Sequence, residues 1–145
     1  MRSAPVGAVV LALLLGACAA QRGYDGPARP RCDTARLVIH SDGSFFGGPG
    51  EVRFEGRFRS VDDRPVGAGK TIVDVLPGSR RVQVQWNRYE APGSFLDDAA
   101  DRRGVWVRTD GGCRTFQVEA EAGKRYVLTW PFSDQGGGPQ GFHED

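Results

Sequence analysis

The stretch EVRFEGRFR, residues 51–59, decides the fold class because its side chains alternate between apolar or small and charged. Val52, Phe54, Gly56 and Phe58 fall on one side, and arginines and glutamates fall on the other. A period of two residues is typical of a β-strand that buries one face. We therefore predict a half-buried strand here. Its charged side is a ladder of mixed sign, which indicates a solvated sheet face, a protected edge or a ligand surface.

Similar strand patterns, rich in β-branched and aromatic residues, occur on both sides of this segment. Pro77-Gly78 suits a type II turn, and Asp110-Gly111-Gly112 is a hairpin turn signal. Seven short strands separated by turns predict an all-β fold, a single antiparallel β-sandwich. The other six expected strands are residues 36–40, 71–76, 80–86, 105–109, 113–120 and 125–130.

The N-terminus carries a processing signal rather than part of the fold. After Arg2, residues 6–15 are all apolar or small. This run is too short to span a bilayer, which takes about 20 residues, and it suits a signal peptide. The run ends in Leu15-Gly16-Ala17-Cys18, which resembles the lipobox of bacterial lipoproteins. An ordinary signal peptide with an incidental cysteine is the alternative.

The lipobox resemblance implies a lipid anchor and a location. It implies diacylglycerol on Cys18, cleavage before that residue and acylation of the new N-terminus, and several acyl chains anchor a protein stably. In such lipoproteins an Asp after the cysteine retains the protein in the inner membrane. Here that position is Ala19. The resemblance thus implies an outer-membrane lipoprotein that faces the periplasm, with the membrane as a partner.

The cysteines and the charge balance indicate which disulfide, metal site or nucleic-acid partner the protein could have. With Cys18 lipidated, Cys32 and Cys113 remain, and an oxidising compartment favours a disulfide between them. A free thiol or a metal ligand is the alternative. The chain has no C-x-x-C pair and only His40 and His143, so we expect no metal site. The charges of the chain after cleavage sum to zero, which argues against a nucleic-acid partner.

Four segments follow from these patterns. Residues 1–17 form the signal peptide, and residues 18–34 form the lipidated cysteine and a flexible tether, because they lack an apolar period. Residues 35–132 form the sandwich domain. Residues 133–145, rich in glycine, form a disordered tail.

Two segments of the domain resemble a recurring pattern of small exported β domains. These are DVLPGSRRVQVQW at residues 74–86 and FQVEAEAGKRYVLTW at residues 116–130. The pattern is similar to uncharacterised conserved lipoproteins, and more loosely to carboxypeptidase-regulatory-like and PEGA-type sandwiches. The resemblance implies a fold and a non-catalytic module.

The candidate chemical motifs are weak. VGAGKT, residues 66–71, lacks the first glycine of a phosphate-binding loop and leads into a strand, so we expect no nucleotide. The two histidines suit structural or solvated positions, and the chain has no G-x-S-x-G motif. We expect no catalytic residues and no cofactor. The acids Glu90, Asp97, Asp98 and Asp101 lack the spacing of a calcium loop and are expected to be solvated.

Two loops are the candidate contact regions. Phe45 and Phe46 stand among glycines in residues 41–50. They indicate either a partner or membrane contact or a plug for the end of the sandwich. The second loop, residues 88–103, carries aromatic residues with the same two interpretations. We predict a non-enzymatic structural or interaction module whose partner is an unknown envelope protein or glycan. The alternative is a small-ligand or glycan binder that uses these two loops.

Overall fold

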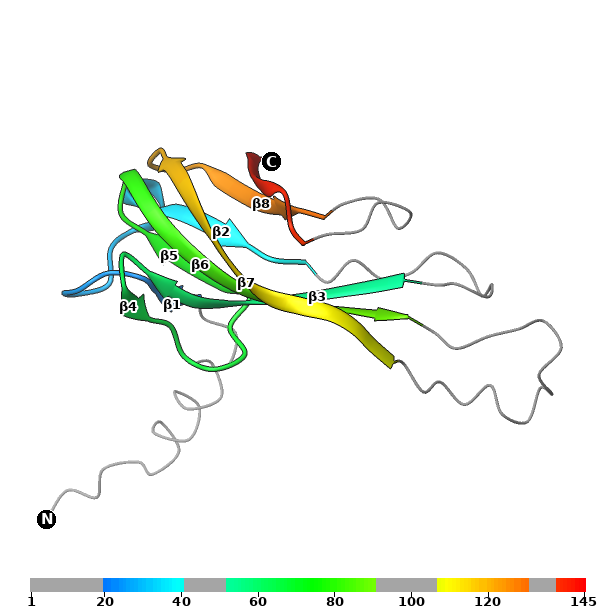
Figure 1. The fold of residues 1–145 in the computed structure, drawn as a ribbon. Helices are drawn as coiled ribbons and strands as arrows, with labels where there is room; N and C mark the ends of the chain where they lie inside the picture. The colour runs from blue at the N-terminus through cyan, green and yellow to red at the C-terminus, as the bar shows by residue number, and fades with distance from the viewer. Residues whose placement is uncertain (1–19, 41–51, 91–106, 131–137) are drawn as a thin grey trace, which may run out of the picture.

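The computed structural model describes residues 20–40, 52–90, 107–130 and 138–145, which fold into two β-sheets (Figure 1). The five-stranded sheet has the order β1-β5-β2-β8-β9, and the four-stranded sheet has the order β4-β3-β6-β7. The strands are β1 (Gln21–Arg22), β2 (Ala35–Val38), β3 (Val52–Val61), β4 (Arg64–Pro65), β5 (Ile72–Val75), β6 (Gly78–Glu90), β7 (Val107–Ala120), β8 (Arg125–Thr129) and β9 (Gly141–Glu144), and a short 3-10 helix covers Arg31–Asp33. The all-β prediction is confirmed.

The five-stranded sheet is mixed, so the prediction of purely antiparallel pairing is wrong. β2 runs antiparallel to β5 but parallel to β8, and β1 runs parallel to β5. Between β2 and β8 the chain crosses to the other sheet for β3 and β4, returns for β5, and crosses again for β6 and β7. A parallel pair needs a long connection of this kind. The four-stranded sheet is antiparallel throughout.

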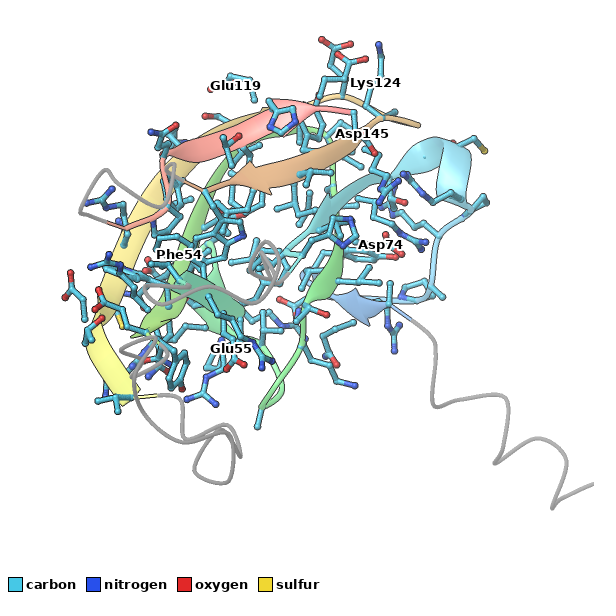
Figure 2. All side chains as sticks on the ribbon, turned by 90° about the vertical axis from the view of Figure 1, so that its right-hand side faces the viewer. Phe54, Glu55, Asp74, Glu119, Lys124 and Asp145 are labelled. Atoms are coloured by element: carbon cyan, nitrogen blue, oxygen red, sulfur yellow. The ribbon has the colours of Figure 1, made fainter. Side chains whose placement is uncertain are left out.

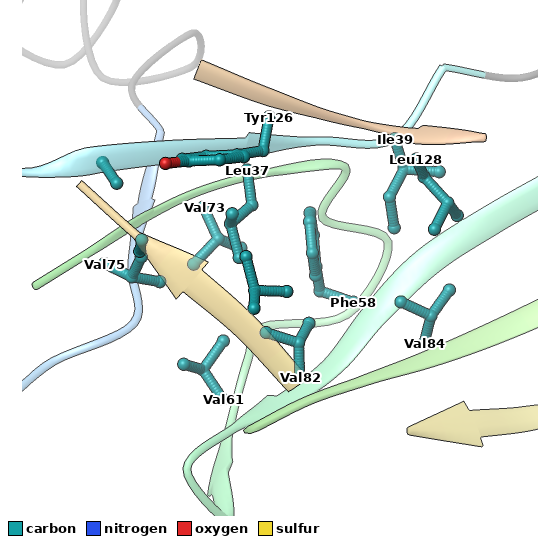
Figure 3. Packing of buried hydrophobic residues seen from close by; sticks show 13 residues of the cluster. Leu37, Ile39, Phe58, Val61, Val73, Val75, Val82, Val84, Tyr126 and Leu128 are labelled. Carbon is teal, nitrogen blue, oxygen red and sulfur yellow. The ribbon is translucent and has the colours of Figure 1, made fainter. Parts of the chain in front are cut away.

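Both sheets contribute to one hydrophobic core. The inward residues of β2, β5 and β8 face those of β3, β6 and β7 (Figure 3). Burial of this shared apolar surface is the main force that stabilises the fold. The core residues are Ala35, Leu37, Ile39, Phe58, Val61, Val73, Val75, Val82, Val84, Val118, Ala120, Tyr126 and Leu128.

β3 follows its sequence pattern. Phe54 and Phe58 are buried, whereas Glu55 lies on the other side of the sheet from Phe54 (Figure 2). The small residue in the apolar series, Gly56, has a packing reason. A Cβ at Gly56 would lie 2.9 Å from both Ile39 Cγ2 and Trp130 Cη2, so only glycine leaves room for these neighbours.

Two acidic residues make the turn from β3 to β4. Asp62 and Asp63 have φ angles of 48° and 63°. Positive φ at both central residues of a two-residue loop is the requirement of a type I′ turn, which aspartate tolerates better than most residues. The predicted turn at Pro77-Gly78 also has its required positive φ, 110° at Gly78, but it carries the chain from one sheet to the other.

β7 is one continuous strand, so the hairpin predicted at Asp110-Gly111-Gly112 is wrong. These residues pair with Arg88, Asn87 and Trp86 of β6. The glycines serve a close approach instead of a turn. A Cβ at Gly111 would lie 2.8 Å from the Trp86 carbonyl oxygen. The structure therefore has nine strands in its described residues, where seven were expected.

Both the expected flexible tether and the expected disordered tail contribute to the fold within their described residues. In the segment expected to be a tether, Gln21–Arg22 pairs with β5 and Tyr24 is buried. In the expected tail, β9 pairs with β8. The ring of Phe142 in β9 stacks on the ring of Phe58, with their centroids 6.0 Å apart, and contacts the ring of Phe116 edge-on, with their centroids 5.7 Å apart. Neither segment shows an apolar period in its sequence, because each contributes a single aromatic side chain, Tyr24 or Phe142, to the buried part of the fold.

Candidate functional site

The outer face of the four-stranded sheet is a polar surface of the described structure. It is formed by alternate residues of β3, β6 and β7, the residues whose neighbours point into the core. We call this surface the outer β3–β6–β7 face. Strand pairing fixes its rows, and one row consists of Arg57, Gln85 and Cys113.

This central row is held by hydrogen bonds across the strands. The guanidinium of Arg57 donates through Nε and Nη2 to Gln85 Oε1, at 3.2 and 3.0 Å. Gln85 therefore holds Arg57 flat against the sheet with a neutral acceptor. The remaining N–H groups of the Arg57 guanidinium point away from this amide, since five donors are arranged as a rigid fork.

Arg59 reaches the same row because β3 is irregular at this point. Phe58 pairs with Val84 and Ser60 with Gln83, so Arg59 is an extra residue in a β-bulge. A bulge redirects a side chain, and here Arg59 Nη1 lies 3.7 Å from Cys113 Sγ, two strands away. The bulge thus brings a second guanidinium across the sheet to the row of Arg57.

The two central arginines differ in their partners from the seven described arginines that form ion pairs. Within the described ranges, no carboxylate lies within ion-pair distance of Arg57 or Arg59. On the same face, Arg53 pairs with Glu55 at 2.6 Å. The other paired arginines are Arg36, Arg64, Arg80, Arg81, Arg88 and Arg125.

The resolved pKa shifts belong to ion pairs outside this face. The hydrogen bond from Arg36 to Asp74 raises the pKa of Arg36, against the opposing effect of burial. At the β3–β4 turn, burial raises the pKa of Asp62, but hydrogen bonds from the Arg81 N–H and the Arg80 guanidinium outweigh it and hold that pKa below its ordinary value. The first pair joins β2 to β5 inside the five-stranded sheet, and the second fastens the β3–β4 turn to β6.

The two histidines have structural contacts. His40 Nε2 lies 3.1 Å from an Arg125 nitrogen, and the His40 carbonyl accepts a hydrogen bond from Trp130 at 2.7 Å. His143 Nδ1 lies 2.6 Å from Thr129 Oγ1. Of the part of the chain that can be described, no group of three or more His, Cys, Asp or Glu side chains has the arrangement of a metal site.

The segment VGAGKT makes contacts of an ordinary strand connection. Val66 packs against the core, and the Lys70 carbonyl accepts a hydrogen bond from the Phe58 N–H at 2.9 Å. The next carbonyl, of Thr71, accepts from the Ile39 N–H. The segment then enters β5, whereas a phosphate-binding loop opens a helix.

The structure does not contain the expected disulfide. Cys32 and Cys113 are exposed free thiols. The Cys32 carbonyl lies 3.9 Å from a Cβ built at Gly123, beyond the end of β7. Cys113 lies about 23 Å back along β7 from Ala120, at roughly 3.3 Å per residue. A disulfide needs Cα atoms within about 7 Å, so this fold keeps the two thiols apart.

Thiol labelling tests this separation. We expect a maleimide to modify both Cys32 and Cys113 in the folded protein without reductant, because both side chains are exposed. Peptide mass spectrometry gives the labelled positions. A disulfide-linked Cys32–Cys113 peptide would contradict the geometry. The variant Cys32→Ser is the control, and we expect its free energy of unfolding to stay within about 0.5 kcal/mol of the parent.

Several predicted site residues lie outside the described residues. These are Cys18, both candidate loop aromatics Phe45 and Phe46, and the acids Asp97, Asp98 and Asp101. Of the second loop, residues 88–90 belong to β6, and Tyr89 pairs with Arg53 and Arg108. The alternation of residues 51–59 places their arginines on one side of a strand, but only the strand register and the bulge place Arg57 and Arg59 beside Gln85 and Cys113.

Comparison with known proteins leaves the site to be interpreted from its own chemistry. No family model, curated protein or solved structure matches the chain. Across residues 20–40, 52–90, 107–130 and 138–145, no helix has the length and apolar character needed to cross a membrane.

Proposed function

We propose that the protein is a lipid-anchored β-sandwich module of the bacterial cell envelope, with a structural or binding role and no catalytic one. The observation that carries this proposal is the sequence Leu15-Gly16-Ala17-Cys18 at the end of an apolar run. The order of these residues is the order that lipid attachment and cleavage need. Cys18 is the only cysteine close to this cleavage position.

The two-sheet arrangement supports a binding module. Both sheets share one core, and a polar surface with fixed side chains remains on the outer β3–β6–β7 face. The side chains that often serve in catalysis have structural partners here, as with His40 and His143. A rigid sheet face that presents guanidinium and amide groups suits recognition of a partner.

The short sequence distance between Cys18 and the first described strand supports the anchored arrangement. The first described strand, β1, begins at Gln21. Only a few residues separate it from Cys18, so the lipid would hold the domain close to the membrane. The proposed site is the periplasmic face of the outer membrane.

Lipid labelling in cells tests the anchor. We expect radiolabelled palmitate to enter the wild-type protein, and replacement of Cys18 with serine to abolish the label and release the protein from the membrane fraction. Cys32→Ser is the matched control, because it removes an exposed thiol of the folded domain, and its label should match that of wild type. Palmitate that persists in Cys18→Ser would contradict the proposal.

A further inference from the structure

Two guanidinium groups lie together in the middle of the outer β3–β6–β7 face. Arg57 is held by Gln85 Oε1, and Arg59 contacts Sγ of Cys113, the residue that pairs with Gln85 on the next strand. The two cations therefore lie along one row that crosses three strands. We call Arg57, Arg59, Gln85 and Cys113 the central cluster.

The central cluster carries uncompensated positive charge among the described residues. Its acceptors are an amide oxygen and a thiol, which are neutral partners, whereas seven other arginines form ion pairs with carboxylates. Two like charges held near each other repel, and an anion between them relieves that repulsion. Guanidinium groups bind planar carboxylates through paired hydrogen bonds. The cluster is therefore suited to an anionic ligand.

The neighbouring rows indicate what carries the anion. Ser60 and Gln83 pair in the row on one side, next to Thr115 of β7. Asn87 pairs with Glu55 in the row on the other side, where Arg53 neutralises the Glu55 carboxylate. Amide and hydroxyl groups both donate and accept hydrogen bonds, as the hydroxyl groups of sugars require. Membrane contact through this face would instead favour apolar side chains beside the basic ones. The rows favour a glycan.

We propose that the outer β3–β6–β7 face binds an acidic polysaccharide, with sugar carboxylates at Arg57 and Arg59 and sugar hydroxyls at the adjacent amides. Strand pairing repeats the spacing of side chains across the face, so an extended polymer can contact several rows at once. The inference deepens the proposed function by naming the partner class, and it rests on that function for the compartment alone. Binding by the purified chain does not depend on the lipid anchor.

Binding to polygalacturonate tests the charge requirement. The probe is polygalacturonate, with its methyl ester as the uncharged control, added to the full chain purified in detergent. We expect binding to the acid form only, and at least a tenfold loss of affinity in Arg57→Gln/Arg59→Gln. The control variant Arg29→Gln removes the charge of an exposed arginine outside this face and should stay within twofold of wild type. An equal loss of affinity for polygalacturonate in the double variant and in the control variant would overturn the proposed site.

The two thiols provide a positional readout in the same protein. Cys113 belongs to the central cluster, whereas Cys32 lies at the end of the fold beside Gly123. We expect polygalacturonate to slow maleimide labelling of Cys113 at least fivefold and to leave Cys32 unchanged. Equal rates at Cys113 with and without the polymer would overturn the proposal, even where a mutant simply failed to fold.

Vesicles separate the polysaccharide from a membrane surface. Phosphatidylglycerol vesicles are offered to the full chain in place of the polymer, with Cys18→Ser as a form without the anchor. Arginine-dependent binding of Cys18→Ser to the vesicles, without binding to polygalacturonate, would assign the face to anionic lipid and overturn the proposal. A failed anchor in the palmitate experiment leaves the polymer result intact, so the two proposals fail separately.

Discussion

Replacement of Phe58 with alanine is expected to lower the free energy of unfolding by about 3–5 kcal/mol. Phe58 is 2% exposed and belongs to the core that joins the two sheets (Figure 3). Its ring stacks on Phe142 of β9, with a centroid separation of 6.0 Å. The substitution removes apolar contacts on both sheets and leaves a cavity, because the β-strands around it cannot close the space.

Urea denaturation followed by circular dichroism measures this loss. A single domain is commonly stable by only about 5–15 kcal/mol, so the variant should unfold at a much lower urea concentration. Phe58→Leu is the graded control, because it retains most of the volume and should cost less than Phe58→Ala. Val107→Ala, at a side chain that is 48% exposed, should have little effect. A Phe58→Ala midpoint equal to that of Val107→Ala would place Phe58 outside the core.

Alternation in the sequence was sufficient to find the strands that build the core. On β3 the alternation placed Phe54 and Phe58 on the inward side correctly, since both side chains are buried. This works because a strand with one buried face selects apolar residues at every second position. The position of Gly56 in that series needed the structure, which shows Ile39 and Trp130 packed against its backbone.

Local signals failed where a distant side chain sets the conformation. Gly111 and Gly112 have the composition of a turn, but Trp86 of the neighbouring strand packs against this part of β7. The central cluster could not be predicted from the sequence for a related reason. The contact of Arg59 with Cys113 depends on a bulge in β3 and on the register of three strands, and neither is encoded in a short window.

The C-terminal segment is the clearest case, because its sequence predicted disorder and its structure contributes to the core. Besides Phe142, Gly138 lies against the indole of Trp86, where a Cβ would be 2.6 Å from Cε2. The Pro139 carbonyl accepts a hydrogen bond from Arg114 at 2.7 Å. Glu144 and Asp145 pair with Lys124 and Arg125, at the edge of the sheet seen in Figure 2. A disordered tail would make none of these contacts.

Replacement of Phe142 with alanine is therefore expected to lower the free energy of unfolding by about 2–4 kcal/mol, somewhat less than a fully buried phenylalanine because its ring is only partly buried. Its neighbour in sequence, His143, is the matched control. That side chain is exposed and contacts only Thr129 among the described partners, so His143→Ala should cost about 1 kcal/mol or less.

Deletion of residues 138–145 should destabilise the domain more than Phe142→Ala, because it also removes the β8–β9 ladder and the cover of Trp86. Trp86 is 6% exposed in the intact fold. The tryptophan emission of the protein should therefore shift to longer wavelength in the deletion variant, because Trp86 becomes exposed to water. The urea midpoint should also fall. A deletion variant with the parent emission maximum and the parent urea midpoint would support the disordered tail that the sequence predicted. A red-shifted emission maximum and a lower urea midpoint in Phe142→Ala, with both values unchanged in His143→Ala, would establish that the Phe142 side chain anchors this segment to the core.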